Sequence, residues 1–199
     1  MKVKKMFLKT LLIFLSIVFI QCESSNAVDY DYLNNQSSYF PLKIGNKWYY
    51  NSNTDPFDST SYNEVWEVKT NLWLFQKNFY LIEKTRYFLD GSIKYDSMYY
   101  CLSNDTLLQF HPSWESSESS ISTRAIFSSN QKFTMKWLDF EYEAYSKNQN
   151  DSVITFTYYI PGGMDSGFET TFHKNIGITK SYSYFVPDAG IRLVDYEFK

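Results

Sequence analysis

Hydrophobic and polar residues alternate along much of the chain with a period of two, the pattern of a strand that buries one face. The clearest stretch, residues 153–160, sets apolar side chains against threonines. The phases picked out by this alternation are Tyr62, Trp66 and Val68; Ile93, Tyr95, Tyr99 and Cys101; Ile154, Phe156, Tyr158 and Ile160; Phe168, Thr170 and Phe172; and Val194, Tyr196 and Phe198. We therefore expect a succession of β-strands.

Turn-forming residues separate these strands. Asp90-Gly91 joins two alternating stretches and predicts a hairpin with a tight turn, because such a turn needs positive φ. The other predicted breaks, rich in Gly, Pro, Asn, Asp and Ser, are residues 113–122, 146–151, 161–167 and 187–190.

Strands at short spacing with tight turns predict an all-β fold, a single antiparallel meander. A sheet of many strands tends to curl or close, because closure removes unpaired edges. We expect a strongly curved open sheet or a barrel, lipocalin-like or similar, in residues 39–199. No sustained period of 3.6 residues follows the N-terminal segment, and at most residues 71–77 or 139–147 would form a short helix.

The N-terminal segment follows a different pattern. Four lysines and no acidic residue flank an apolar run from Leu11 to Ile20. The run fits the core of a secretory signal, about 7–15 residues, and is shorter than the roughly 20 residues of a membrane span. Cys22 follows it, and residues 23–38 are polar and without periodicity, which predicts a flexible tether.

This arrangement resembles the signal of bacterial lipoproteins, whose cysteine is acylated, with chains such as palmitate, and begins the mature protein. The resemblance implies a signal peptide at 1–21, a lipidated Cys22 with its tether at 22–38, and a β domain at 39–199. It implies a lipid-anchored protein of the bacterial cell envelope, with the outer membrane as the expected location. Otherwise the protein is secreted with a free thiol, and a Cys22–Cys101 disulfide becomes conceivable.

The amino-acid composition limits the kinds of partner that we expect the protein to bind. Loss of residues 1–21 moves the formal net charge from −3 to −7. An acidic chain is unsuited to nucleic acid, which is bound by clustered Lys and Arg, so we expect no nucleic-acid partner. Aromatic residues make up 20% of the chain, which suits the core of a β-sheet or a ligand surface. Cys101 lies on an apolar strand face, and we expect a buried, inert thiol.

The start and end of the β region carry a further resemblance. "YFPLKIGNKWYY" at 39–50 resembles the opening of a group of bacterial lipoproteins of unassigned function, with Phe-Pro-Leu, then Gly-Asn and a Trp. "HKNIGITKSYSYF" at 173–185 resembles their closing segment. The group has no known catalytic residues to transfer. A more distant likeness is to lipocalins, through Gly45 and Trp48; we expect Gly45 to permit a tight turn and Trp48 to plug one end of the sheet.

Candidate chemistry is sparse. Asp165, Glu169 and His173 are spaced by four, which would align metal ligands on a helix but separates them by roughly 13 Å on a strand. His111 precedes a proline and is interpreted as a loop residue. No nucleophile elbow, phosphate loop, paired-cysteine motif or calcium loop is present. We therefore expect no catalytic residue, no metal and no cofactor, and a protein that is not an enzyme.

The favoured function is the binding of an apolar or amphipathic ligand in the concavity of the sheet. Residues 79–88 carry large apolar side chains on both faces, so one face can pack the core while the other contacts ligand. The candidate ligand-binding residues are Tyr80, Ile82 and Phe88. Two alternatives stay open: a module that recognises a glycan or an envelope protein through exposed Tyr and Trp, and a hydrolase with an unrecognised carboxylate site.

Overall fold

The structure, a computed structural model, describes residues 39–52, 62–110, 121–128, 132–137, 140–163, 167–184 and 190–199. All of them belong to one unit, Ser37–Lys199. Within these ranges the chain forms strands and no helix. The expected signal peptide, Cys22, the tether, His111 and Asp165 lie outside the described residues.

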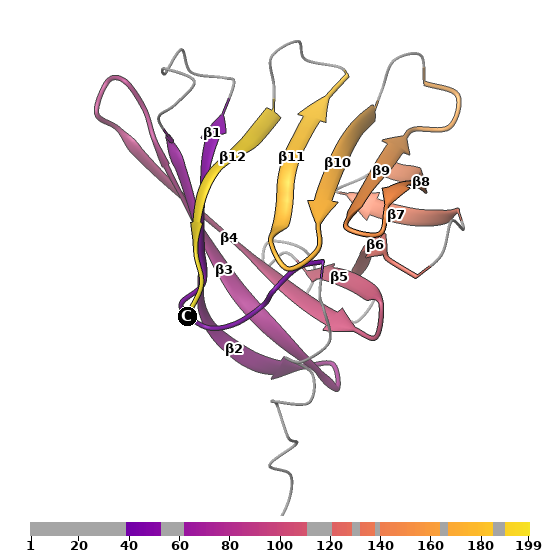
Figure 1. Cartoon of the computed structure of the whole chain (residues 1–199), viewed down its shortest axis with the longest axis horizontal. Helices are drawn as coiled ribbons and strands as arrows, with labels where there is room; N and C mark the ends of the chain where they lie inside the picture. Colours follow the sequence, from indigo (N-terminus) through magenta and orange to yellow (C-terminus); the bar gives the residue numbers. More distant parts are fainter. Residues whose placement is uncertain are drawn as a thin grey trace, which may run out of the picture. The chain divides into compact units, whose positions relative to one another are not determined.

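Twelve strands make one antiparallel sheet in the described part of the chain (Figure 1). In chain order they are β1 (Lys47–Ser52), β2 (Glu64–Leu74), β3 (Lys77–Tyr87), β4 (Ile93–Ser103), β5 (Thr106–Phe110), β6 (Ser122–Ile126), β7 (Phe133–Trp137), β8 (Phe140–Asn150), β9 (Val153–Tyr159), β10 (Gly167–His173), β11 (Gly177–Ser183) and β12 (Gly190–Glu197). Neighbours in space run β6-β5-β4-β3-β2-β1-β12-β11-β10-β9-β8-β7. The predicted all-β antiparallel meander is confirmed.

The two edge strands, β6 and β7, meet without a continuous backbone ladder. The hydroxyl of Ser122 on β6 donates to the carbonyl of Lys136 on β7 at 2.7 Å and accepts from the Lys136 amide at 3.0 Å. A side chain thus stands in for backbone pairing at this seam. The sheet is a nearly closed barrel with one unsealed seam, because β1 pairs with β12 and joins its two halves.

Residues 39–46 close one end of the barrel. Phe40 and Leu42 enter the core, and Trp48 at the start of β1 is fully buried. Gly45 turns the chain with φ +91° and donates its amide to the Val68 carbonyl at 2.8 Å. The expected tight turn at Gly45 and the plugging role of Trp48 are both present.

The core confirms several of the predicted strand phases. Ile154, Phe156 and Tyr158 of β9 are buried, as are Thr170 and Phe172 of β10. The edge and face contacts among their aromatic rings stay within the ordinary centroid range, roughly 4.5–7 Å. Part of the aromatic excess therefore packs the barrel interior.

The alternating apolar residues predicted for β4 lie on the outer face of the sheet and not in the main core. Met98 and Tyr100, in phase with Lys94 and Asp96, join the main core. Cys101 lies on the opposite face in a second, outer cluster with Phe79 and Phe110. Its thiol is buried, and burial raises its pKa to about 11. Charge did not mark the outer face here because Lys94 and Asp96 lie in the exposed first part of β4, whereas Met98, Tyr100 and Cys101 are buried on both faces of its second part.

The two segments that the sequence allowed as a short helix form strands where the structure describes them. Residues 71–74 end β2, and Phe75-Gln76, both with positive φ, form a two-residue turn into β3. Residues 140–147 lie in β8, which runs through most of the predicted 146–151 break and ends at Asn150. The hairpin at Asp90-Gly91 is present, but its loop spans residues 88–92 because β3 and β4 pair last at Tyr87 and Ile93.

A bulge shifts the predicted phase of β12. Tyr49 pairs with Asp195 while Tyr50 pairs with Leu193, so Val194 is the extra residue. Ile191 and Leu193 pack against the core, whereas Val194 is exposed. The extra residue moves the alternation by one position, which no periodicity in the sequence announces.

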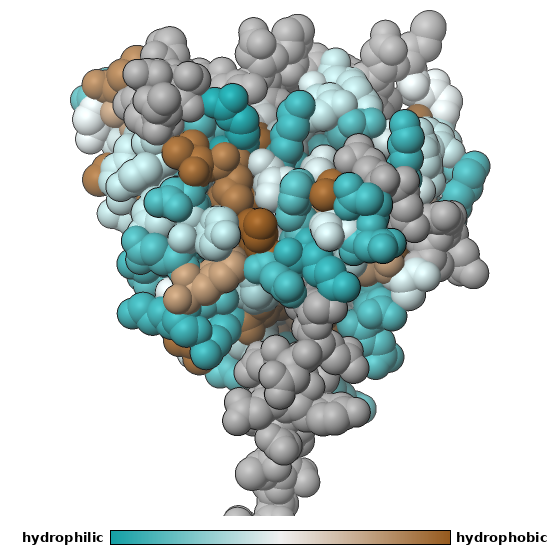
Figure 2. Space-filling model, in the orientation of Figure 1, coloured by the Kyte–Doolittle hydropathy of each residue, from teal (hydrophilic) through white to brown (hydrophobic). Residues whose placement is uncertain are grey.

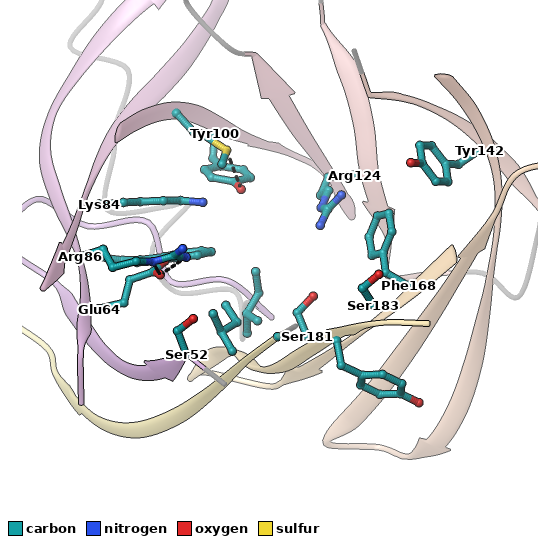
Figure 3. A pocket seen from close by; sticks show the side chains of 16 residues that line it. Ser52, Glu64, Lys84, Arg86, Tyr100, Arg124, Tyr142, Phe168, Ser181 and Ser183 are labelled. Atoms are coloured by element: carbon teal, nitrogen blue, oxygen red, sulfur yellow. Dashed lines mark hydrogen bonds and ion pairs between the residues drawn. The ribbon is translucent and has the colours of Figure 1, made fainter. Parts of the chain in front are cut away.

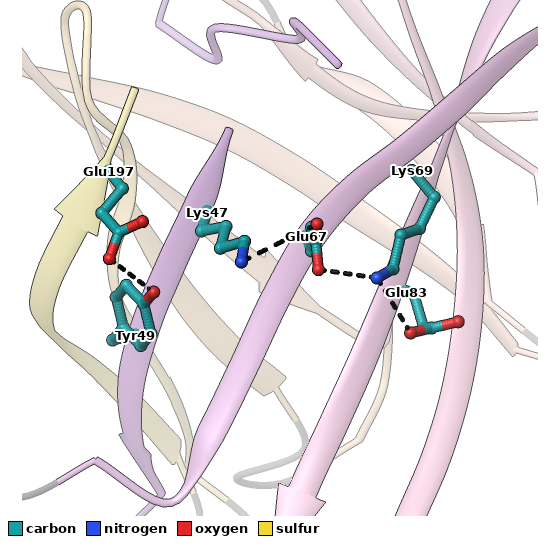
Figure 4. A network of polar contacts seen from close by, with 6 residues as sticks. All are labelled: Lys47, Tyr49, Glu67, Lys69, Glu83 and Glu197. Carbon is teal, nitrogen blue, oxygen red and sulfur yellow. Dashed lines mark hydrogen bonds and ion pairs between the residues drawn. The ribbon is translucent and has the colours of Figure 1, made fainter. Parts of the chain in front are cut away.

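The outer surface is mostly hydrophilic in the view of Figure 2, where apolar side chains lie mainly along the path of β12. Figure 4 shows a chain of charges across β1, β2 and β3: Lys47 contacts Glu67 at 3.8 Å, and Lys69 bridges Glu67 at 2.7 Å and Glu83 at 3.6 Å. Surface pairs of this kind contribute about 0–1 kcal/mol each. These charged side chains make the outer face of the barrel hydrophilic.

Candidate functional site

A cavity of about 440 Å³ lies inside the barrel (Figure 3). Its lining comes from both halves of the sheet: Ser52, Glu64, Trp66, Lys84, Arg86, Met98, Tyr100, Arg124, Tyr142, Phe168, Ile178, Ser181, Tyr182, Ser183, Gly190 and Ile191. Ser52 ends β1 and Glu64 begins β2, so the cavity lies toward that end of the barrel, away from the plug at 39–46. Small-molecule sites commonly measure about 300–1,000 Å³.

The only carboxylate in the cavity lining of the described residues is already engaged. Glu64 and Arg86 are cross-strand partners on β2 and β3. The Arg86 Nε donates to Glu64 Oε2 at 2.7 Å, and a second guanidinium nitrogen contacts the same oxygen. The other oxygen, Oε1, accepts from the Trp66 indole at 2.6 Å. Glu64 thus neutralises Arg86 and fixes the Trp66 ring.

Lys84 is held by an aromatic face. It is the cross-strand partner of Trp66, and its ammonium lies 3.8 Å from the centroid of that ring. Such cation–π contacts are worth about 0.5–2 kcal/mol. Burial lowers the pKa of Lys84 to about 8, against the opposing influence of the Glu64 and Asp96 carboxylates.

Arg124 reaches the cavity through an irregularity of β6. Leu107 pairs with Ala125 and Leu108 with Thr123, so Arg124 is the extra residue of a β-bulge. Its guanidinium carbon lies 4.8 Å from the Phe168 ring centroid and 5.1 Å from that of Tyr158, and one nitrogen is 3.1 Å from the Met135 sulfur. The side chain is only 8% exposed. A bulge can re-aim a side chain in this way.

The remaining lining is apolar with a few hydroxyls. Tyr100 is buried, and burial raises its phenol pKa to about 12. Burial also raises the pKa of Tyr142, although Arg124 acts in the opposite direction. The Ser181 hydroxyl lies 3.0 Å from that of Thr170. At neutral pH these phenols stay protonated and serve as hydrogen-bonding groups.

None of the candidate ligand-binding residues lines this cavity. Ile82 is fully buried in the core, and Tyr80 packs against the core. Phe88 follows β3 in the hairpin loop and is half-buried. The cavity instead uses Lys84 and Arg86, the next two residues in the same phase.

Sequence reasoning missed the charged residues of the cavity. The available signal was a charge in phase with apolar neighbours: Glu64 with Trp66 and Val68 on β2, and Lys84 with Ile82 on β3. Arg124 gave no such signal, because its position in a bulge breaks the alternation.

The residues considered for catalysis or metal binding are dispersed. Glu169 and His173 lie on the outer face of β10, separated by Thr171. Hydrogen bonds to the Glu169 carboxylate come from Tyr182 and from Thr157, the latter at 3.1 Å. Within the described ranges, no group of three or more His, Cys, Asp or Glu side chains could hold a metal ion.

Comparisons with known proteins give little to transfer. No family model matches the chain, and no curated protein matches it. A solved structure of a “putative lipoprotein” from Parabacteroides distasonis is similar at 10% identity and a TM-score of 0.44, covering 81% of this chain and 99% of that one. A likeness at this level carries no argument. A search of the described residues found no helix long and apolar enough to cross a membrane.

Proposed function

We propose that the protein is a lipid-anchored protein of the bacterial cell envelope that binds a small amphipathic ligand inside the barrel, without catalysis. The observation that carries the binding proposal is the cavity of about 440 Å³. A volume of this size suits one small molecule or a single acyl chain.

The character of the lining supports an amphipathic ligand. Trp66, Phe168, Ile178 and Ile191 offer apolar and aromatic surface, while the charged groups gather on β2, β3 and β6. Binding sites for small molecules are mostly apolar with a few placed polar groups that fix orientation. The anchor proposal rests separately on the resemblance of residues 1–22 to a lipoprotein signal.

Mass spectrometry with solvent extraction tests the binding proposal. The full chain is purified beside a Ser183→Trp variant, whose indole would fill part of the cavity that Ser183 lines. We expect a lipid or other amphiphile to be recovered near one equivalent from the wild type and to be depleted from the variant. Lipid that merely surrounds the anchor would be equal in both, and equal recovery would contradict binding in the cavity.

An exposed hairpin favours a second candidate function, recognition of a protein or glycan partner. Tyr87, Leu89, Ile93 and Tyr95 around the β3–β4 turn are 40–66% exposed. Exposed aromatic residues are frequent anchors at interfaces. Pull-down of one partner by the wild type, lost in a Tyr95→Ser, Leu89→Ser variant, would support this role.

A further inference from the structure

We infer that the ligand carries an anionic head group, a carboxylate or a phosphate, bound in the cavity between the ammonium of Lys84 and the guanidinium of Arg124. This inference rests on the proposed function, since it names the chemistry of the ligand at the same site. Figure 3 shows the two side chains converging from opposite sides, one from β3 and one from β6.

The described cavity lining carries more cationic than anionic side chains. Among the described residues that line the cavity, Lys84, Arg86 and Arg124 are cationic and Glu64 alone is anionic. Glu64 is matched to Arg86 by direct contacts. Within the described lining, cationic side chains therefore outnumber carboxylates by three to one, and such a lining favours an anion.

The way in which Lys84 is held points in the same direction. Its ammonium sits over the Trp66 ring and forms no ion pair within the described ranges. Asp96, its cross-strand partner on β4, uses one carboxylate oxygen to accept the Ser97 amide at 2.8 Å. A ring face fixes the direction of an ammonium by taking an N–H that points at the ring, and the N–H donors directed away from the ring stay available to a ligand.

Arg124 supplies the second cation, which the bulge of β6 aims inward. The guanidinium carbon lies 4.8 Å from the Phe168 ring centroid and 5.1 Å from that of Tyr158, and these two rings stack on one another at 4.4 Å. A guanidinium presents paired donors that match a carboxylate or phosphate bidentately. An anionic ligand between Lys84 and Arg124 would accept charge-assisted hydrogen bonds from both residues.

The apolar part of the same lining defines the rest of the ligand. Ile178 and Ile191, on β11 and β12, contribute aliphatic surface across from Trp66 and Met98. The expected ligand class is therefore a single-chain amphiphile with one anionic end, such as a fatty acid or a monoalkyl phosphate.

Isothermal titration of the full chain in lipid nanodiscs tests this assignment, with empty nanodiscs as the background. The probes share a C8 chain and differ in the head group: octanoate, octyl phosphate and octanol. We expect an anion to bind about tenfold or more tighter than octanol at pH 7, because hydrogen bonds to charged groups are the stronger ones. Octyl phosphate tighter than octanoate would indicate a phosphate head group, and the reverse a carboxylate.

Three variants locate the anion. Lys84→Met and Arg124→Gln should each reduce the preference for the anion about tenfold while octanol still binds, and Arg124→Lys should recover part of it. Lys43→Met is the matched control, because Lys43 is exposed at the opposite end of the barrel, and its preference should equal that of the wild type. Should Arg124→Gln fail to fold, Lys84→Met carries the test alone.

The outcomes separate the two proposals. Equal affinity for octanol and both anions would overturn the anionic head group and leave ligand binding standing. No binding of any probe would overturn the proposed function itself. An anion preference that survives in both Lys84→Met and Arg124→Gln would overturn the assignment to these residues.

Discussion

Gly177 lies against Phe40 so closely that a methyl group on its Cα would stand 2.8 Å from the ring carbon Cδ2. The same methyl group would be 3.2 Å from the Trp48 indole nitrogen, which donates to the Ile176 carbonyl at 2.5 Å. Residues from opposite ends of the β domain, Phe40 and Trp48 on one side and Ile176 and Gly177 on the other, therefore meet at the closed end of the barrel. This packing contact gives a physical reason for finding the two sequence motifs in the same chain.

Gly177→Ala should destabilise the domain by at least about 2 kcal/mol. The residue has φ +105°, a strained conformation for alanine that costs about 1–3 kcal/mol, and the added methyl overpacks the Phe40 contact. Urea unfolding followed by tryptophan fluorescence would measure the lower midpoint at unchanged slope.

Gly91→Ala separates the two causes. Gly91 has φ +81° but faces open space, with no atom within 4 Å of the added methyl. This variant should lose only about 1 kcal/mol, through backbone strain alone. Equal losses in the two variants would show that the Phe40 contact does not contribute.

The order of the strands was readable from the sequence because burial of one face imposes a period of two. Which of the two faces of a strand points into the barrel was harder to predict. Met98 and Tyr100 face the interior in phase with Lys94 and Asp96. Lys94 and Asp96 are exposed at the start of β4, and further along the strand both faces are buried, so charge in one part of the strand did not indicate its outward face.

The site was partly readable for the same reason. Tyr80 and Ile82 marked the inward face of β3, and the next residues in that phase, Lys84 and Arg86, line the cavity. Arg124 was unreadable, because it depends on a bulge. Bulges change the register between strands while leaving the local composition unchanged.

Cys22→Ser should release the protein from membranes. The prediction follows from the lipoprotein-like signal, since an acylated cysteine would supply about 0.8 kcal/mol of membrane affinity per buried acyl carbon. Membrane fractionation of the two proteins, with the intact mass of the wild type, would measure it. Unchanged fractionation together with an unacylated wild-type mass would contradict the lipid anchor.

Lys84→Met should stabilise the unliganded domain by about 2 kcal/mol at pH 7. Burial lowers the folded-state pKa of Lys84 from 10.5 to about 8, which corresponds to roughly 3 kcal/mol at about 1.4 kcal/mol per pH unit. Loss of the contact with Trp66 offsets about 1 kcal/mol of the gain. Urea unfolding would measure it, and a destabilised variant would contradict the cost assigned to this buried charge.

The wild type should also gain stability as pH rises from 8 towards 10. The folded-state pKa of Lys84 lies below its unfolded value, so within this window the unfolded chain binds more protons and stability increases with pH. Below pH 8 the penalty is constant. The groups that face Lys84 are Glu64, Asp96, Arg86 and Arg124, and the difference between wild type and Lys84→Met isolates Lys84 from them.

Affinity for octanoate should fall above pH 8 in the wild type. Deprotonation of Lys84 removes one of the two inferred anion contacts, whereas the carboxylate of octanoate stays ionised. Titration calorimetry at pH 7, 8, 9 and 9.5 would show a decline that approaches about tenfold in total, the loss expected for Lys84→Met. Lys84→Met should be flat over this range, and a parallel decline in that variant would assign the effect to another group.

Glu64→Gln should have opposite effects on stability and on binding. The substitution leaves the Arg86 guanidinium without its carboxylate, which we expect to cost about 2 kcal/mol, less than for a fully buried pair because the Arg86 side chain is 33% exposed. It also removes the only negative charge of the described cavity lining. Octanoate should therefore bind more tightly to a domain that unfolds at lower urea.

The double variant Glu64→Gln, Arg86→Gln tests the pairing directly. Removal of both charges should recover part of the lost stability, because residues in direct contact are energetically coupled, and should return octanoate affinity towards the wild-type value. Lys84 and Arg124 remain in this variant to hold the anion. Additive stability losses would show that Glu64 does not neutralise Arg86. A loss of octanoate binding equal to that in Arg124→Gln would show that Arg86 itself holds the anion.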